Sequence, residues 1–217
     1  LFREIVSYNT LLYKYASKIH HATNSPLYIQ DYIASSLEFA EINARLISSL
    51  KDLTQVQLQN VSVPSLDTMA LGFVTGQLAY APNPGRMVIY GNCAPRRTSD
   101  RARKDNFDHG IKYAKLKNGT EIINVYSEQA FGFVKKDIVE FKNIKCPNSG
   151  SQFRSRDFFP LAVAKIIDGN YEDVTEDLDV NLIPDIEHDE VAWTDGFGNV
   201  KTTMRMSDLK KMGLQPG

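Results

Sequence analysis

Between residues 55 and 170 the sequence alternates between strand-like and helix-like segments, and this alternation limits the possible fold more than any other feature. Residues 56–63 alternate apolar and polar side chains, and residues 86–92 form a short apolar run. Residues 111–127 predict two strands around a central Asn-Gly pair, which is favoured in tight hairpins. These segments supply the predicted strands.

Three segments between the predicted strands have helical character. A helix is expected from Asp67, a good N-cap residue, to about residue 79, and a short helix over residues 131–141. A third helix is predicted after a cap at Asp157 and ends at Gly169. Strands that alternate with helices indicate an α/β fold, so we assign residues 55–170 to an α/β domain.

The two ends of the chain have a different texture. Residues 1–54 predict a helical extension, with an amphipathic helix over residues 28–51. Its expected apolar face consists of Ile33, Leu37, Ala40, Ala44 and Ile47. The acid-rich residues 171–188 predict a solvated linker, and residues 189–217 predict the start of a small, β-rich, barrel-like C-terminal domain that is incomplete.

Composition excludes several classes of function. A net charge of −1 argues against a general nucleic-acid or membrane-surface binder. The two cysteines form no metal-ligand pattern, and no apolar run approaches membrane-spanning length. We therefore expect a cytoplasmic protein that has no metal and no nucleic-acid or membrane partner.

The segment "WTDGFGNVKTT" (193–203) is the most informative motif. Its flanks are β-prone and alternate, so they predict two strands joined by a corner that contains two glycines. In one interpretation, Asp195 and Asn199 only bond the backbone of the turn. In the other, the corner is a ligand site, with Phe197 as a stacking surface and Asp195 and Asn199 as hydrogen-bonding edges.

Two further segments are locally basic. The loop "YGNCAPRRTSDRARKDN" (90–106) follows a predicted strand, where α/β proteins usually place their sites, and arginine suits carboxylates and phosphates. In "GSQFRSRDFFP" (150–160), Arg154 and Arg156 precede a helix N-terminus, which attracts anions. The alternative for both segments is a solvated loop with arginines in water.

In chain order, these three segments resemble the family of S-adenosyl-L-methionine hydroxide adenosyltransferases and the related fluorinases and chlorinases. "DGFGNVKTT" is similar to that family's Asp-x-Phe-Gly-Asn-hydrophobic-x-Thr-Asn signature, and "SQFRSRDFFPLAVAKI" resembles its Thr-Phe-His-Gly-Arg-Asp segment. "MVIYGNCAPRR" stands where the family has a strand that ends in Val-Val-Asp-Pro-Gly-Val-Gly. The resemblance covers roughly residues 55–206.

The resemblance implies a homo-trimer with sites between the N-terminal domain of one subunit and the C-terminal domain of its neighbour. There S-adenosyl-L-methionine is the substrate or ligand, no further cofactor is needed, and a nucleophile attacks the 5′ carbon to release methionine. Asn199 would contact the adenine edge, Phe197 would shape the pocket and Asp195 would hold the corner. The other substrate-binding residues that it implies are Phe153, Arg156 and Asp157.

The sequence departs from the family at the positions that would carry the chemistry. Hydrolytic members orient water with an aspartate, an arginine and a histidine; here Asn92 stands at the aspartate position and Arg154 at the histidine position. The arginine could be Arg96, Arg97 or Arg101. An amide takes up no proton at neutral pH, and an arginine is permanently charged.

Three hypotheses are therefore open. The first is an enzyme that cleaves S-adenosyl-L-methionine with water or a small anion, with Asn92, Arg97, Arg101 and Arg154 as its catalytic candidates. The second is a catalytically inactive relative that binds an adenosyl compound or only assembles with partners. The third is an unrelated α/β domain whose loops match by chance.

Overall fold

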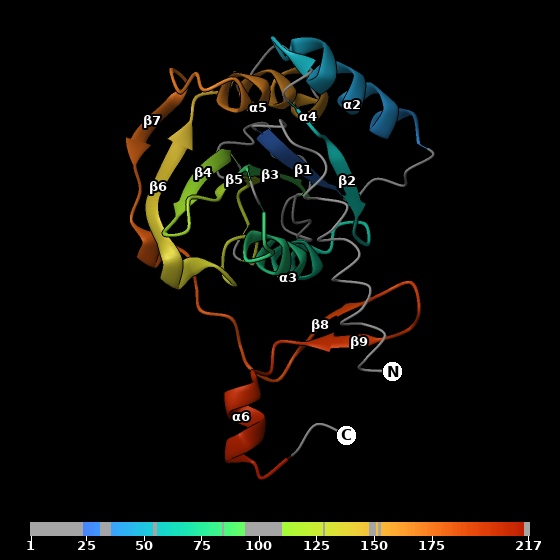
Figure 1. Cartoon of the computed structure of the whole chain (residues 1–217), viewed down its shortest axis with the longest axis vertical. Helices are drawn as coiled ribbons and strands as arrows, with labels where there is room; N and C mark the ends of the chain where they lie inside the picture. The colour runs from blue at the N-terminus through green and yellow to red at the C-terminus, as the bar shows by residue number, and fades with distance from the viewer. Residues whose placement is uncertain are drawn as a thin grey trace.

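The computed structural model describes residues 24–30, 36–53, 56–83, 85–93, 110–127, 129–147, 151 and 153–214. These residues form a seven-stranded sheet in the order β2-β1-β3-β5-β4-β6-β7 and a separate two-stranded sheet, β8-β9 (Figure 1). The strands are β1 (Asn24–Gln30), β2 (Gln59–Ser62), β3 (Arg86–Asn92), β4 (Ile111–Leu116), β5 (Glu121–Val125), β6 (Ile138–Ile144), β7 (Val174–Asp177), β8 (Val191–Thr194) and β9 (Val200–Thr202). The α-helices are α2 (Leu37–Ser49), α3 (Thr68–Ala79), α4 (Arg154–Asp157), α5 (Phe159–Ile167) and α6 (Met206–Lys211), and the 3-10 helices are η4 (Lys135–Asp137) and η5 (Val180–Leu182). The predicted α/β fold class is confirmed.

The large sheet has a parallel half and an antiparallel half. Strands β2, β1, β3 and β5 are parallel, whereas β4, β6 and β7 are added by antiparallel pairing. The chain runs from β1 outward to β2 and then returns to β3 on the other side of β1. Strand order therefore reverses between β1 and β3, and the carboxyl ends of strands at such a reversal are where open α/β sheets bind ligands.

Helices cover both faces of the sheet (Figure 1). Helices α2, α4 and α5 lie over one face and α3 lies over the other. Successive residues of a strand point to opposite faces: Tyr90 and Ile123 join the core beneath α2 and α5, whereas Ile89 and Ile122 join the core beneath α3. The molecule therefore has a three-layer arrangement with two apolar cores.

Several local predictions are confirmed by their hydrogen bonds. Helix α3 begins after Asp67, whose side chain accepts a hydrogen bond from the Ala70 amide at 2.9 Å. The β4–β5 hairpin turns at Asn118 and Gly119, and Gly119 has a φ of 86°, which favours glycine. Helix α5 ends before Gly169, which also has a positive φ of 79°. At these positions local chemistry was sufficient to place the elements.

The helix predicted over residues 28–51 is wrong in its first part. Residues 24–30 form β1, which pairs with β2 on one side and with β3 on the other, and α2 begins only after its N-cap Ser36. Pairing on both sides of a strand overrides local helical propensity. The described part of the predicted extension, residues 1–54, thus adds a strand to the sheet and a helix to its covering layer; residues 1–23 lie outside the described residues.

The predicted apolar face of this helix is also wrong. Leu37 and Ile47 are exposed, and the side chains that α2 buries include Ile42 and Leu46. Both stripes have helical spacing, so periodicity alone did not distinguish them. The contact of α2 with α5 decides which stripe is buried.

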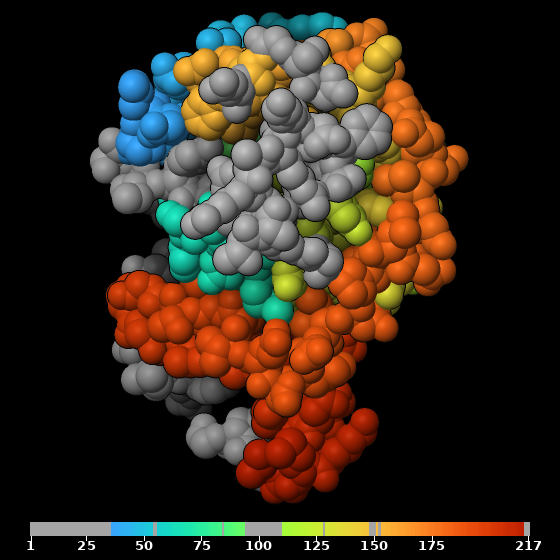
Figure 2. Space-filling view, turned by 180° about the vertical axis from the view of Figure 1, so that it is seen from behind, coloured from blue at the N-terminus to red at the C-terminus, as the bar shows by residue number. Residues whose placement is uncertain are grey.

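Two segments predicted as helix or linker belong to the antiparallel half of the sheet. In residues 131–141 only η4 is helical, and β6 starts at Ile138. Within the acidic segment 171–188, β7 pairs with β6 at the sheet edge. Residues 189–214 form the β8–β9 hairpin and α6, which Figure 2 shows as a ledge and a lobe beneath the main body. The barrel-like C-terminal domain stays a prediction.

A half-buried arginine joins three elements at the amino end of the central strands. Arg86, at the start of β3, donates from Nε to Glu121 Oε1 on β5 at 2.7 Å. Its two other nitrogens donate to the backbone oxygens of Ile167 and Ile166, both at 2.7 Å, at the end of α5. A cation is favoured at a helix C-terminus because the last carbonyl groups carry partial negative charge.

The carboxylate of this pair is almost completely enclosed. Glu121 is 3% exposed, and its second oxygen accepts hydrogen bonds from the hydroxyl groups of Tyr113 and Tyr171 at 3.0 and 2.8 Å. Burial, and then the charge of Glu121, raises the pKa of Tyr113, so its hydroxyl stays protonated and donates. Each oxygen of the buried carboxylate therefore has a partner.

We expect Arg86→Met to destabilise the fold strongly, because it leaves the Glu121 carboxylate buried without its cation. The expected loss in the free energy of unfolding is about 3–5 kcal/mol, measured by urea denaturation. Arg45→Met is the matched control, because Arg45 is 49% exposed and lies 3.5 Å from Asp157; its loss should stay below about 1 kcal/mol. Equal losses in the two variants would contradict this account of the pair.

Candidate functional site

Asn92 ends β3 at the point where strand order reverses. It lies opposite Gln30, the last residue of β1, and is 4% exposed. Its amide can donate and accept hydrogen bonds but takes up no proton near neutral pH, so Asn92 can position a polar group without acting as a base. Cys93 follows and is fully buried. Arg97 and Arg101 lie outside the described residues.

The sequence predicted that Asp157 caps the helix that ends at Gly169, and this prediction is wrong. Asp157 is the last residue of α4, and α5 follows Phe158, whose side chain makes no capping hydrogen bond. Instead, Asp157 accepts hydrogen bonds from Arg156 and from the Ser151 hydroxyl group, and these bonds, that of Arg156 first, lower its pKa to about 2. The carboxylate is therefore ionised under physiological conditions.

Arg156 and Asp157 connect α4 to α2. Arg156 Nε lies 2.8 Å from Asp157 Oδ1, and its Nη1 lies 3.4 Å from Glu41 Oε2 on α2. Arg45 of α2 lies 3.5 Å from the same Asp157 oxygen. The Arg156 guanidinium also lies over the Phe153 ring, 5.2 Å from its centroid. Phe153, Arg156 and Asp157 are thus brought together. The charges of Arg156 and Asp157, however, already form ion pairs with each other and with α2.

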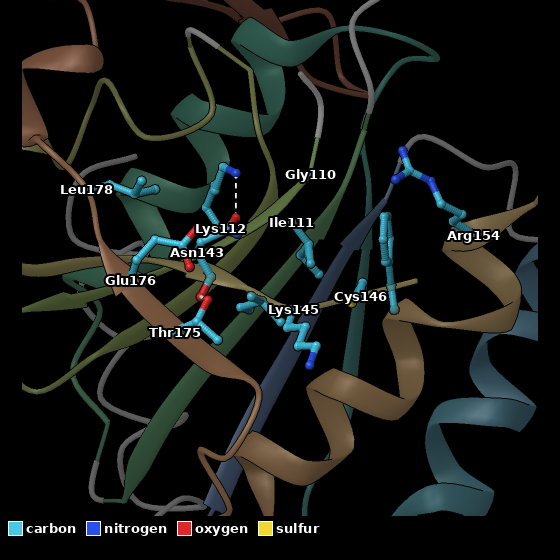
Figure 3. A pocket seen from close by; sticks show the side chains of 12 residues that line it. Gly110, Ile111, Lys112, Asn143, Lys145, Cys146, Arg154, Thr175, Glu176 and Leu178 are labelled. Atoms are coloured by element: carbon cyan, nitrogen blue, oxygen red, sulfur yellow. Dashed lines mark hydrogen bonds between the residues drawn. The ribbon is translucent and has the colours of Figure 1, made fainter. Parts of the chain in front are cut away.

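Arg154, on the same short helix, lines a different place: a cavity of about 420 Å3 formed by β4, β6, β7, α4 and the residues beside them (Figure 3). The polar side chains that line this cavity are Lys112, Asn143, Lys145, Arg154, Thr175 and Glu176. We call it the β4–β7 cavity. The Arg154 guanidinium lies 5.7 Å from the centroid of the Phe159 ring, which is also part of the lining.

The Lys112 end of the β4–β7 cavity is a chain of hydrogen bonds. Lys112 Nζ donates to Asn143 Oδ1 at 2.6 Å, and Asn143 Nδ2 donates to Glu176 Oε1 at 3.1 Å. Burial lowers the pKa of Lys112, and the charge of Glu176 acts in the opposite direction. The register of the sheet places Lys112 directly opposite Asn143, so the strands themselves build this end.

The Arg154 end of the cavity also contains a cysteine. Burial raises the pKa of the Cys146 thiol to about 11, so it is neutral at physiological pH and is a poor nucleophile. Burial also lowers the pKa of Arg154, although an arginine remains charged at any physiological pH. This end therefore offers a fixed positive charge beside an aromatic ring.

The Asp195–Asn199 corner is a closed hydrogen-bonded turn between β8 and β9. Asp195 Oδ1 accepts from the backbone amides of Phe197 and Asn199 at 3.0 and 2.9 Å. Asn199 Nδ2 donates to the two Asp195 oxygens at 3.2 and 2.9 Å, and Lys201 Nζ lies 3.4 Å from Asp195 Oδ2. The turn bonding of the first interpretation is therefore present, and it also fixes the direction of the Asn199 amide.

Phe197 projects from this turn into solvent. It is 95% exposed, whereas Ala192 of β8 is buried and Trp193 packs against the core beneath α3. The hairpin is thus anchored at its base and presents an aromatic ring at its tip. Asn199 Oδ1 accepts no hydrogen bond from a described residue, so it is available as an acceptor.

None of three cavities lined by described residues contains parts of all three segments. The β4–β7 cavity contains Arg154 but neither Asn92 nor the Asp195–Asn199 corner. Two further cavities of about 410 and 430 Å3, beside Phe133, contain none of the predicted site residues. The corner stands outside all three.

Sequence reasoning missed the β4–β7 cavity because its polar residues come from three strands far apart in the chain. Lys112 follows a buried residue in an alternating strand, which is the pattern of an ordinary sheet surface. Only the pairing of β4 with β6 brings it to Asn143. In the described ranges no group of three or more His, Cys, Asp and Glu side chains could hold a metal ion, and no helix is long and apolar enough to cross a bilayer.

The mixed sheet and the helices on its two faces define the chain as an α/β protein. Comparisons with known proteins find similarity in fold only. No family model and no curated protein matches the sequence. Among solved structures, the chain is similar to an uncharacterized conserved protein from Thermotoga maritima, with a TM-score of 0.66 and 15% identity over 88% of this chain and 75% of that chain. It is also similar to a conserved hypothetical protein from Thermus thermophilus, with a TM-score of 0.56 and 15% identity over 83% and 73% of the two chains.

The Asp195 corner should titrate at low pH. The hydrogen bond from Asn199 is the main cause that lowers the pKa of Asp195 to about 2, from an ordinary value of 3.8. Since the folded pKa is depressed, the carboxylate supports the turn fully above pH 3.8, and this support is lost as pH falls through about 2. An NMR titration of the side-chain carboxyl carbon, with the Phe197 and Asn199 amides as reporters, should give a midpoint near 2. Asp195→Asn should remove the transition, and a wild-type midpoint near 3.8 would contradict the hydrogen-bonded turn.

Proposed function

We propose that the protein binds an adenosyl compound, with S-adenosyl-L-methionine as the expected ligand, at sites shared between copies in a homo-trimer. One observation carries the proposal: Asp195 holds the Asn199 amide in a fixed direction beside the exposed Phe197 ring. The resemblance of this corner and of two other segments to the adenosyltransferase family gives the ligand class.

The corner has the chemistry that adenine recognition needs. A carboxylate only accepts hydrogen bonds, so the Asn199 nitrogen must face Asp195 and the Asn199 oxygen faces outward. An asparagine amide can accept from the adenine amino group and donate to a ring nitrogen. An aromatic ring such as that of Phe197 provides a stacking surface, worth about 1–3 kcal/mol per base.

A shared site explains why these groups face solvent in one copy. The exposed ring of Phe197 would gain free energy if it were buried against another surface. In the proposal, that surface is the carboxyl end of β3 in a neighbouring copy, where Asn92 lies at the reversal of strand order. Arg97 and Arg101 follow Asn92 in the sequence and would complete the site.

Cleavage of the ligand is the second candidate function. The sulfonium of S-adenosyl-L-methionine is a good leaving group, so a protein needs mainly to position and partly desolvate the nucleophile. Buried Asn92 could hydrogen-bond a water or a small anion for attack on the 5′ carbon, which gives adenosine or an analogue plus methionine. It cannot remove a proton, and this favours binding without rapid turnover, or an assembly role, over hydrolysis.

Both cysteines are free thiols, which suits the proposed cytoplasmic location.

Isothermal titration calorimetry with S-adenosyl-L-methionine and with adenosine tests the binding proposal. Asn199→Ala and Phe197→Ala should each weaken binding about tenfold or more, because each removes a specific contact to the base. Asn181→Ala is the matched control, since Asn181 is exposed on η5 and should leave the affinity unchanged. No binding of either ligand, or equal affinity of all variants, would refute the proposal.

The same samples can test turnover and assembly. Chromatography after incubation with S-adenosyl-L-methionine should show adenosine and methionine above the buffer blank if the second candidate is correct. Sedimentation should give a trimer, and full affinity in a strictly monomeric sample would contradict a shared site.

A further inference from the structure

We propose that the β4–β7 cavity is a second binding site, which takes a small organic anion with a carboxylate or phosphate group. The cavity contains three cationic side chains, Lys112, Lys145 and Arg154, and one carboxylate, Glu176. This local positive excess occurs in a chain whose net charge is −1. The site is separate from the adenosyl site and does not depend on it.

Burial increases the effect of these charges. Lys112 and Arg154 are both partly removed from water, and this desolvation lowers the pKa of each. A bound anion would favour their charged forms again, and charges interact more strongly in a partly buried site than in bulk water. The cavity is therefore better suited to an anion than an exposed cluster of the same three side chains would be.

The carboxylates that face the cavity do not cancel its charge. Glu176 accepts a hydrogen bond from Asn143 and interacts with Lys112. Asp173, which influences Cys146, is already bound to Lys165 at 2.7 Å. Lys145 makes no ion pair with a described residue. A positive charge thus remains for a ligand.

The shape and the apolar part of the lining indicate an organic ligand. A volume of about 420 Å3 exceeds what a bare phosphate fills and lies in the usual range for small-molecule sites. Ile111, Ile144 and Phe159 supply apolar lining. Ile111 lies between the Lys112 end and the Arg154 end (Figure 3). The anionic group would lie at the Arg154 end, where the planar guanidinium can make two parallel hydrogen bonds. The Lys112–Asn143–Glu176 chain would receive a hydrogen-bonding group at the other end.

Other classes of ligand fit less well. A cationic ligand would meet three like charges, and like charges in one partly buried site repel. A nucleic acid would need an extended basic surface, whereas the three cationic side chains of this cavity line one small hollow between β4, β6, β7 and α4. A small anion is the class that agrees with both charge and size.

Titration of the isotope-labelled full chain with glutarate and with glycerol 3-phosphate, at constant ionic strength set by sodium chloride, tests this site by NMR. Amide resonances of Lys112, Lys145 and Thr175 should shift and saturate with one of the two probes. Arg154→Gln should raise the dissociation constant of that probe about tenfold, because a charged hydrogen bond is lost. Lys145→Gln is a second variant on an exposed position that should keep the fold and weaken binding.

Lys115→Gln is the matched control, since Lys115 lies on the same strand as Lys112 but does not line the cavity. The Lys115→Gln variant should bind the probe as the wild type does. The Asn199→Ala variant should do so too, and this result would show that the cavity is distinct from the adenosyl site. Shifts that fail to saturate, that sodium chloride alone reproduces, or that persist unchanged in both Arg154→Gln and Lys145→Gln would overturn the proposal.

Discussion

The ion pair between the half-buried Arg86 and the buried Glu121 is the interaction on which the arrangement of the sheet depends. It joins the first residues of two neighbouring parallel strands to the C-terminal end of α5. A buried carboxylate and a half-buried guanidinium each need hydrogen-bonding partners, and tyrosine hydroxyl groups and helix carbonyl groups supply them here. Since these partners come from elements far apart in sequence, the pair specifies one register and one position for α5.

This network lies at the amino end of the central strands, so the opposite end is free to carry binding groups. A close contact fixes the strands near that end as well. A side chain at Gly91 would collide with Asn124, whose Oδ1 lies 1.7 Å from the position of an added Cβ. Asn124 in turn donates to the Ala130 backbone at 3.1 Å and holds the turn that follows β5. The close approach of Gly91 to the Asn124 side chain therefore fixes the end of β3, and with it the position of Asn92.

Local chemistry predicted much of the fold, whereas tertiary pairing decided the rest. Asp67, Asn118 and Gly119 act on their own neighbours, and their effects were visible in the sequence. Strands β1 and β7 were missed because their stability comes from partners elsewhere in the chain, and β7 is acidic at an exposed sheet edge. The Asp195 turn was foreseen for the same local reason as Asp67. The β4–β7 cavity was not, because no single segment contains more than a part of it.

Arg154 belongs to one of the segments that resemble the adenosyltransferase family, and it also lines the β4–β7 cavity. At this position the resembled family has a histidine, which can exchange a proton, whereas an arginine offers only a fixed positive charge. Arg154 lines the β4–β7 cavity beside Phe159, whereas Asn92 is not among the residues that line this cavity. Carrying the histidine's role over to Arg154 would therefore need a different chemistry. Anion binding needs only a fixed positive charge, which an arginine supplies at any physiological pH.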